Sequence, residues 1–260
     1  MINFAQNSLT KFLGMNLFYH FGRYFILLSR VFKKPEKSSI YIKQVLVDID
    51  NFGLKSLGIV AITSVFMGAV VTIQTAFNVD HPFMPIYAIG FTTRQSIILE
   101  FSPTIISMVL AGKVGSRIAS EIGTMRVTEQ IDALEIMGIN PAGFLILPKV
   151  IASVLINPIL VVLSIFLGIF GGWLSAYLTG VVPESNYTYG ILYEFAQFDI
   201  FYALIKTIVF AFLIATISGY FGFYTKGGAL EVGQSSTKAV VFSSIFIIVF
   251  NLILTQLLLA

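Results

Sequence analysis

Long apolar runs are the feature that most constrains what this chain can fold into. The first, Ser56–Phe77, is about 22 residues long and carries no charge, which matches the length that one helix needs to cross a bilayer core. Backbone groups in lipid have no water to bind, so a spanning segment must satisfy its hydrogen bonds internally, as a helix does. Four further runs follow: Ile86–Leu110, Phe144–Gly180, Ile200–Tyr224 and Ala239–Ala260. We therefore predict an all-α membrane protein with five transmembrane helices.

The third run is too long for one straight crossing. Phe144–Gly180 has about 37 residues, or about 55 Å as a helix. We expect it to tilt, to kink near Pro148 or Pro158, or to extend beyond the bilayer. Gly168 and Gly172 form a G-x-x-x-G pair, which predicts a close contact with another helix.

Composition agrees with a membrane protein and excludes several chemistries. Of the 260 residues, 57% are hydrophobic and 11% are charged, whereas soluble domains have about 25% charged residues. There is no cysteine, which excludes disulfides, thiolate metal sites and cysteine nucleophiles. The only histidines are His20 and His81, so a histidine-rich metal site is not expected. We predict no catalytic residue, no metal and no cofactor.

The distribution of lysine and arginine predicts the orientation. Eight of them precede the first run, whereas the loop Val181–Asp199 has none and carries three acids. Cytoplasmic loops are enriched in Lys and Arg, so the N-terminus, the segment after the second run and the turn Thr225–Lys238 should be cytoplasmic. With five spans, the C-terminus should lie on the opposite, periplasmic side.

The N-terminal residues 1–55 form a predicted segment of their own, ahead of a five-span domain over residues 56–260. Apolar residues recur at helical spacing from Met1 to about Arg30, with basic and polar residues between them. This pattern suits an amphipathic helix in the membrane interface, or an ordinary helix packed on the bundle. A basic connector, Val31–Lys55, follows.

A charged island, Ala111–Pro141, separates the second and third runs. Its charges cannot lie in lipid, so it should sit at or beyond the membrane surface. A second helix is predicted to begin at Thr128 as its N-cap and to stop near Gly138. That helix either docks on a soluble partner or covers the end of the bundle. The first half of the island carries small residues at every fourth position, a stripe that favours close packing on a helix of this subunit or of a copy: Ala111, Gly115, Ala119 and Gly123.

The island does not bind nucleotide by any motif we can identify. Gly112–Ser116 hints at a phosphate loop, but the spacing G-x-x-x-x-G-K-[ST] is absent throughout the chain. If the protein performs energised work, the ATPase must be another chain.

The island also carries a family resemblance. Leu110–Ser116 (LAGKVGS) and Glu121–Glu135 (EIGTMRVTEQIDALE) resemble the signature of the MlaE/YrbE family, permease subunits of ABC transporters that move lipids with MCE-domain proteins. The similarity extends through Glu100–Pro103, Asn140-Pro141, the Lys149 region and Val232–Val241, and so covers the chain from about Ser56 onward. It implies a homodimeric permease in the bacterial inner membrane, with phospholipid as cargo. The implied partners are a cytoplasmic ATPase, a periplasmic MCE-domain protein and a small cytoplasmic STAS-type subunit, with no nucleic acid.

By this resemblance the island is a coupling helix seated on the ATPase. The residues expected to contact the ATPase are Arg126, Thr128, Glu129, Gln130, Asp132 and Glu135. The lipid pathway or the dimer interface is expected to include Arg94, Glu100 and Asn251. Two positions depart from the family pattern, which often has Arg where this chain has Leu99 and an acid where it has Asn251.

The charges within the spans have alternative interpretations. Glu100 lies deep in the second run, where a charge faces a cavity, a partner or a structural polar group. Arg94 is about 120° away from it around a helix, so we expect Arg94 to snorkel outward. Lys206, in the first turns of the fourth run, is expected to snorkel too.

Two other functions fit this sequence less well than a permease. An ion-coupled secondary transporter usually shows internal repeats and several intramembrane carboxylates, whereas this chain has only Glu100 as a deep acid. A membrane-embedded lipid-modifying enzyme would need clustered His, Asp, Glu or Cys at one face. The acids of the island, Glu129, Asp132 and Glu135, have no His or Cys among them.

Overall fold

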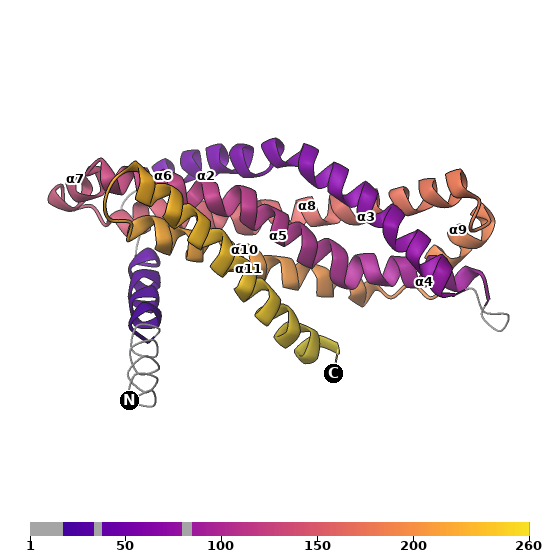
Figure 1. The fold of residues 1–260 in the computed structure, drawn as a ribbon. Helices are drawn as coiled ribbons and strands as arrows, with labels where there is room; N and C mark the ends of the chain where they lie inside the picture. Colours follow the sequence, from indigo (N-terminus) through magenta and orange to yellow (C-terminus); the bar gives the residue numbers. More distant parts are fainter. Residues whose placement is uncertain (1–17, 34–37, 80–84, 260) are drawn as a thin grey trace, which may run out of the picture.

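The computed structural model describes residues 18–33, 38–79 and 85–259 (Figure 1). Every regular element in these ranges is a helix. Five helical stretches are long and apolar enough to cross a membrane: Tyr41–Asn78, Tyr87–Val127, Pro141–Thr179, Gln197–Phe223 and Ala229–Leu258. The predicted all-α class and the five spans are confirmed.

The first and last spanning helices are longer than the apolar runs from which they were predicted. Helix α2 (Ser38–Phe52), a 3₁₀ turn η1 (Leu54–Ser56) and α3 (Leu57–Asn78) follow one another, so much of the expected basic connector is helical. Helix α11 (Ala229–Leu259) likewise begins well before Ala239. A charged residue marks the end of an apolar run in the sequence. The helix can continue past it, because Lys and Glu have good helix propensity.

The second span is one long stretch with two π-helical segments. It runs through α4 (Tyr87–Ser96), η2 (Ile97–Ile105), α5 (Ile106–Leu110), η3 (Ala111–Gly115) and α6 (Ser116–Val127). Pro103 lies inside η2, and a proline cannot donate the usual hydrogen bond to the carbonyl four residues earlier. A π-helical bulge there accommodates the missing bond. The first half of the charged island therefore extends the second span as helix.

Helix α8 (Pro141–Thr179) has 39 residues, or about 58 Å, and is unbroken at Pro148 and Pro158. It packs along α3 through glycines. A Cβ atom on Gly68 would collide with the carbonyl oxygen of Gly168, and one on Gly171 would collide with that of Val65. This is the close helix contact that the glycines of the third run predict.

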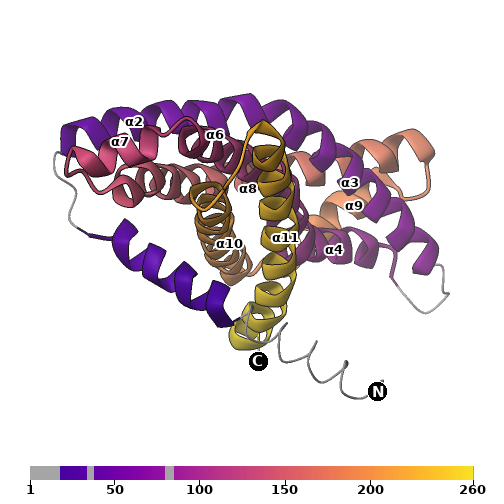
Figure 2. The same ribbon diagram turned by 60° about the vertical axis from the view of Figure 1, so that its left-hand side comes forward.

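The loop after α8 contains a further helix, α9 (Glu184–Leu192), which packs on α4. Helix α10 (Gln197–Phe223) then passes through the middle of the bundle, and 61% of its apolar window is buried. Helix α11 lies on the outside and diverges from α10 toward its C-terminal end (Figure 1, Figure 2). Only 11% of its apolar window is buried.

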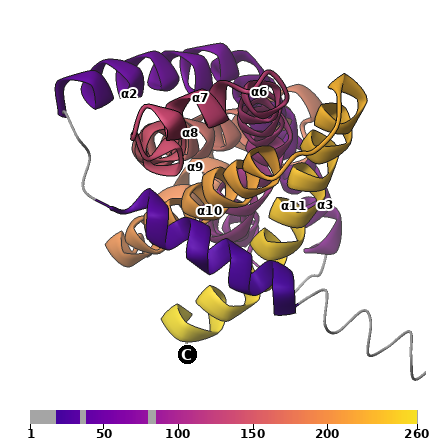
Figure 3. The ribbon, with the colours of Figure 1, turned by 90° about the vertical axis from the view of Figure 1, so that its left-hand side faces the viewer.

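A separate N-terminal helix, residues 18–31, runs across the long axis of the bundle (Figure 1, Figure 3). His20 Nδ1 and Tyr220 Oη are 2.7 Å apart, and the hydroxyls of Tyr24 and Thr216 are also 2.7 Å apart, so the helix is tied to α10. Phe18 and Phe25 point outward and are exposed. The helix therefore both packs on the bundle and presents an apolar face, and the remainder of the predicted Met1–Arg30 helix lies outside the described residues.

Candidate functional site

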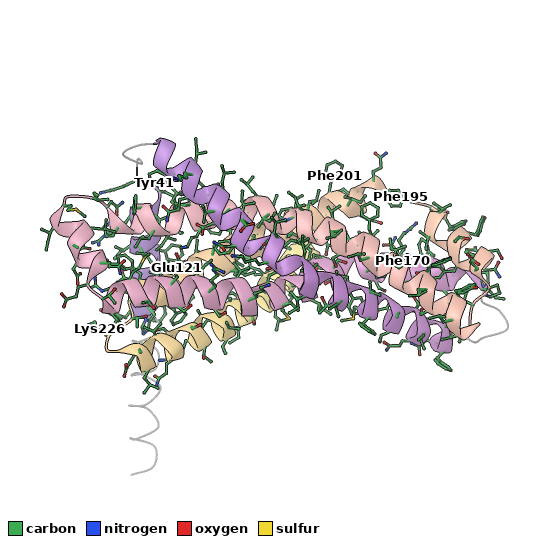
Figure 4. The ribbon with its side chains drawn as sticks, turned by 90° about the horizontal axis from the view of Figure 1, so that it is seen from above. Tyr41, Glu121, Phe170, Phe195, Phe201 and Lys226 are labelled. Carbon is green, nitrogen blue, oxygen red and sulfur yellow. The ribbon has the colours of Figure 1, made fainter. Side chains whose placement is uncertain are left out.

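One end of the bundle holds the island and the turn between α10 and α11. Helix α7 (Gln130–Ile136) lies at its tip, directly after α6, and the turn into α11 lies at the same end of the bundle (Figure 1). We call this the α7 end. In Figure 4, Glu121 and Lys226 lie toward it, whereas Phe170, Phe195 and Phe201 lie in the other half of the molecule.

The turn into α7 differs from the sequence prediction. Thr128 is the C-cap of α6 rather than the N-cap of α7. Its hydroxyl donates back to the carbonyl of Thr124 at 2.9 Å and accepts from Gln130 Nε2 at 3.0 Å, so it cannot cap the next helix. The N-cap is Glu129, in the left-handed region at φ 59°. Gly138, at φ 78°, follows the C-cap Met137, near the predicted stop.

Helix α7 is anchored on one side and open on the other. Ile131 is fully buried in the main core, and Leu134 packs against that core. Arg126 and Asp132 form an ion pair at 2.5 Å on the partly exposed side. Ile136 is 88% exposed and Met137 is 64% exposed, beside the exposed acids Glu129 and Glu135. The tip therefore presents apolar side chains next to negative charge.

The small-residue stripe packs within this subunit. Ala111 is buried in a cluster with Phe210 and Ile247, from α10 and α11. A Cβ atom on Gly115 would lie 2.9 Å from the hydroxyl of Ser218, and one on Gly123 would lie 3.2 Å from that of Thr225. A Cβ atom on Gly222 would lie 2.8 Å from the carbonyl oxygen of Ala119. The stripe holds α6 and η3 against α10 and α11, which decides between the two packing partners left open above.

A buried cluster of charges ties the island to two other helices. The ammonium of Lys149, on α8, donates to Glu121 of α6 at 2.8 Å and to Asp48 of α2 at 3.5 Å. Lys149 and Asp48 are both buried, and Asp48 Oδ2 has no hydrogen-bond partner among the described residues. Sequence reasoning missed this cluster. The available signal was a lysine placed within the apolar stretch that follows Pro141.

A second ion pair lies inside the spans. Lys206 Nζ donates to Glu100 Oε1 at 2.8 Å, which joins α10 to the π-helical η2. The other oxygen of Glu100 accepts from Asn251 Nδ2 of α11 at 2.9 Å. Hydroxyls complete the network around the two charges, from Tyr202, Thr104 and Thr255. The structure thus brings Glu100 and Asn251 together, as the resemblance groups them, and adds Lys206.

Lys206 does not snorkel, contrary to the sequence prediction. Its side chain has no exposed surface, whereas that of Glu100 is 41% exposed. Its ammonium also donates to the carbonyl of Leu99 at 3.2 Å. That carbonyl is the one four residues before Pro103, which has no N–H to offer it. The proline, the π-helix and the ion pair therefore form one local structure.

Arg94 lies elsewhere and does not snorkel either. It is almost completely buried, and its guanidinium donates to the carbonyls of Ile191 at 2.7 Å and Tyr193 at 2.9 Å. These carbonyls lie at the C-terminal end of α9, which a helix leaves without internal partners. The structure separates Arg94 from the Glu100 network and gives it a capping role.

The described residues contain no group of His, Cys, Asp and Glu that could hold a metal ion. The fold is thus a polytopic helical membrane protein with an intramembrane ion pair and a projecting helix at one end. Proteins of this class include transporter membrane subunits. The model of the family described as Permease MlaE matches residues 45–257, and the chain belongs to this family of membrane permeases.

Several curated proteins are similar over most of the chain. A probable ABC transporter permease protein of Rickettsia prowazekii is 36% identical, over 90% of this chain and 88% of its own length. One from Synechocystis sp. is 38% identical over the same shares of the two chains. The chloroplastic protein TRIGALACTOSYLDIACYLGLYCEROL 1 of Arabidopsis thaliana is 35% identical, over 89% of this chain and 66% of its own length.

Proposed function

We propose that this permease is the membrane subunit of an ABC transporter that moves phospholipids or related lipids. A separate cytoplasmic ATPase provides the energy, and an MCE-domain protein on the periplasmic side exchanges lipid with it. The exposed tip of α7 carries this proposal, because it joins the signature residues to a surface that no described residue covers. The name of the Arabidopsis relative refers to a diacylglycerol lipid, which supports the proposed class of cargo.

The α7 tip has the features of a docking surface. An apolar centre next to charges is the usual anatomy of a protein interface. Ile136 and Met137 provide the apolar part, and Glu129 and Glu135 provide charges that a basic groove would complement. Helix α6 continues the second span without a break, so motion of the ATPase at the α7 end could reach η2 and Glu100 along one helical stretch. We propose that the α7 end is cytoplasmic, with the N-terminus on the same side.

The exposed side of α11 supports a homodimer. A helix with this little burial in its own subunit needs lipid or protein on its outer face. The partly buried Asn251 of the same helix bonds to Glu100 of η2. The side chain of Glu100, beside Asn251, is 41% exposed in the single subunit. We propose that two copies face each other across α11 and that the lipid pathway lies between them. We also propose a small cytoplasmic STAS-type subunit as a partner.

Charge reversal at the tip tests the proposal. The protein is extracted in a mild detergent from its native membrane, and the co-purifying ATPase is quantified by mass spectrometry. Glu129→Lys places a cation against the expected basic groove, and we expect at least about a tenfold loss of bound ATPase. Glu194→Lys is the matched control, because Glu194 is also exposed and also has a positive φ, of 45°.

Transport provides the second measurement. Vesicles that contain the intact complex should transfer lipid only with ATP, and Glu129→Lys should lose this transfer together with the ATPase. A protein that purifies alone and moves lipid without nucleotide would refute the ABC mechanism. Lipids that co-purify with the complex identify the cargo class by mass spectrometry.

A further inference from the structure

A polar pocket lies where the charged island meets the second span. It has a volume of about 360 Å³ and lies between the end of α2, the η3–α6 junction and α11. This volume is at the lower end of small-molecule sites. Its lining residues are Asn51, Phe52, Lys113, Val114, Ser116, Arg117, Ser120 and Ser236. The lining therefore contains two cations and no carboxylate.

The nitrogen donors of this pocket are largely free, whereas its three serine hydroxyls donate to backbone carbonyls. One N–H of Lys113 is held by the carbonyl of Lys55, which leaves two donors on its ammonium. The guanidinium of Arg117 makes no hydrogen bond or ion pair among the described residues, and the side chain is exposed. The oxygen of the Asn51 amide accepts from Lys55 at 2.6 Å, so its NH₂ group remains as a donor. A site with cations and spare N–H groups suits an anion.

The carboxylates nearby are already engaged. Lys149 lies between Asp48 and Glu121, and both acids bond to its ammonium. Asp48 still attracts Arg117 through space, but neither acid lines the pocket. A bound anion would therefore meet Lys113 and Arg117 without a carboxylate between them.

The position of the pocket along the span corresponds to a membrane surface. Lys113 is the first charged residue after Glu100, about 20 Å further along the helix. Phe52 and Val114 give the pocket an apolar side, and the first turns of α3 expose Ile59 and Ile62 nearby in the sequence. Basic pockets between transmembrane helices at this level bind the phosphate of lipid head groups.

We propose that the Lys113–Arg117 pocket binds a phosphate group, supplied by an anionic lipid head group of the adjacent leaflet. Arg117 forms a bidentate pair with two phosphate oxygens, as guanidinium groups do, and Lys113 contributes a point charge. The site is distinct from the Glu100 network and from the α7 tip. This proposal depends on the proposed orientation of the protein in one respect only, namely which leaflet of the membrane provides the lipid.

The absence of cysteine allows a local probe. Gly112 lies next to Lys113 without lining the pocket, and a Cβ atom there meets nothing within 4 Å. The full-length Gly112→Cys protein therefore carries one fluorophore beside the pocket. The labelled protein is placed in nanodiscs of phosphatidylcholine. These contain increasing fractions of phosphatidylglycerol, which bears a nitroxide high on its acyl chain. Nitroxide-labelled phosphatidylcholine serves as the neutral comparison, and the readout is quenching at equal mole fraction.

We expect phosphatidylglycerol to be preferred over phosphatidylcholine by at least about fivefold, and Arg117→Gln to lower the preference by about fivefold. High salt should weaken the preference too. Lys226→Gln, which removes an exposed cation from the turn after α10, should leave it unchanged. Lys113→Gln should also lower it, but Lys113 holds the Lys55 carbonyl, so Arg117→Gln is the decisive variant.

Inorganic phosphate separates the two sources of the anion. If phosphate at millimolar concentration changes the fluorescence in an Arg117-dependent way and the two lipids quench equally, the site binds free phosphate. If the two lipids quench equally and phosphate has no effect, the proposal is wrong. An unchanged preference in Arg117→Gln would also overturn it. Because the readout is binding, it does not depend on whether the complex transports lipid.

Discussion

The pair of Lys206 and Glu100 leads to an asymmetric prediction about stability. The two side chains differ in exposure, since Lys206 is completely buried and Glu100 is 41% exposed. Removing one member of a buried pair costs about 3–5 kcal/mol when the remaining charge stays buried and uncompensated. The cost should therefore depend on which partner is removed.

Glu100→Gln leaves the buried ammonium without its countercharge. The amide oxygen can still accept from Lys206, so we expect a loss near the lower limit, about 3 kcal/mol. Lys206→Met leaves a carboxylate that is less buried than the ammonium and that still accepts from Asn251 at 2.9 Å and from Thr255 at 3.2 Å. We expect it to cost about 1–2 kcal/mol. The double variant should cost less than the sum, because it leaves no unpaired charge.

The assay is unfolding in mixed micelles titrated with SDS, for all four proteins of this double-mutant cycle. Lys226→Met provides the control for loss of an exposed cation, and we expect it to be close to neutral. The reasoning is refuted if Lys206→Met destabilises more than Glu100→Gln, or if the two single variants are additive within about 0.5 kcal/mol.

Two further variants test the packing and the second ion cluster. Gly68→Ala places a methyl group against the carbonyl oxygen of Gly168 and should cost about 3 kcal/mol in the same unfolding assay. Gly58→Ala, where a Cβ atom meets nothing within 4 Å, should be neutral or stabilising by up to about 1 kcal/mol, and equal effects at the two glycines would contradict the close contact. Lys149→Met strands the buried carboxylate of Asp48 and should cost about 3–5 kcal/mol. Adding Asp48→Asn should recover part of this loss, and a lack of recovery would show that the carboxylate is not the cause.

Several features of the site could be predicted from local sequence. The stop of α7 near Gly138 follows from a glycine that takes a positive φ, and the contact at Gly168 follows from the G-x-x-x-G spacing. The N-cap at Thr128 was predicted wrongly, because a threonine hydroxyl can either cap the next helix or bond back to the preceding turn. The local sequence does not decide between these two bonds.

The sequence by itself determined the number of spans, their helical form and the polar character of the island. These properties depend on hydropathy and periodicity, which are local features of the sequence. The bilayer then requires each apolar span to satisfy its backbone hydrogen bonds internally, as a helix does. Only the tertiary structure decided which charges meet. Lys206 and Glu100 are 106 residues apart, and Lys149 and Asp48 are 101 apart. A hydropathy pattern shows that a lysine lies in a span, but its partner depends on which helices are neighbours and how each is rotated. For this reason Lys206 and Arg94 were expected at the membrane surface, and both are buried against specific acceptors instead.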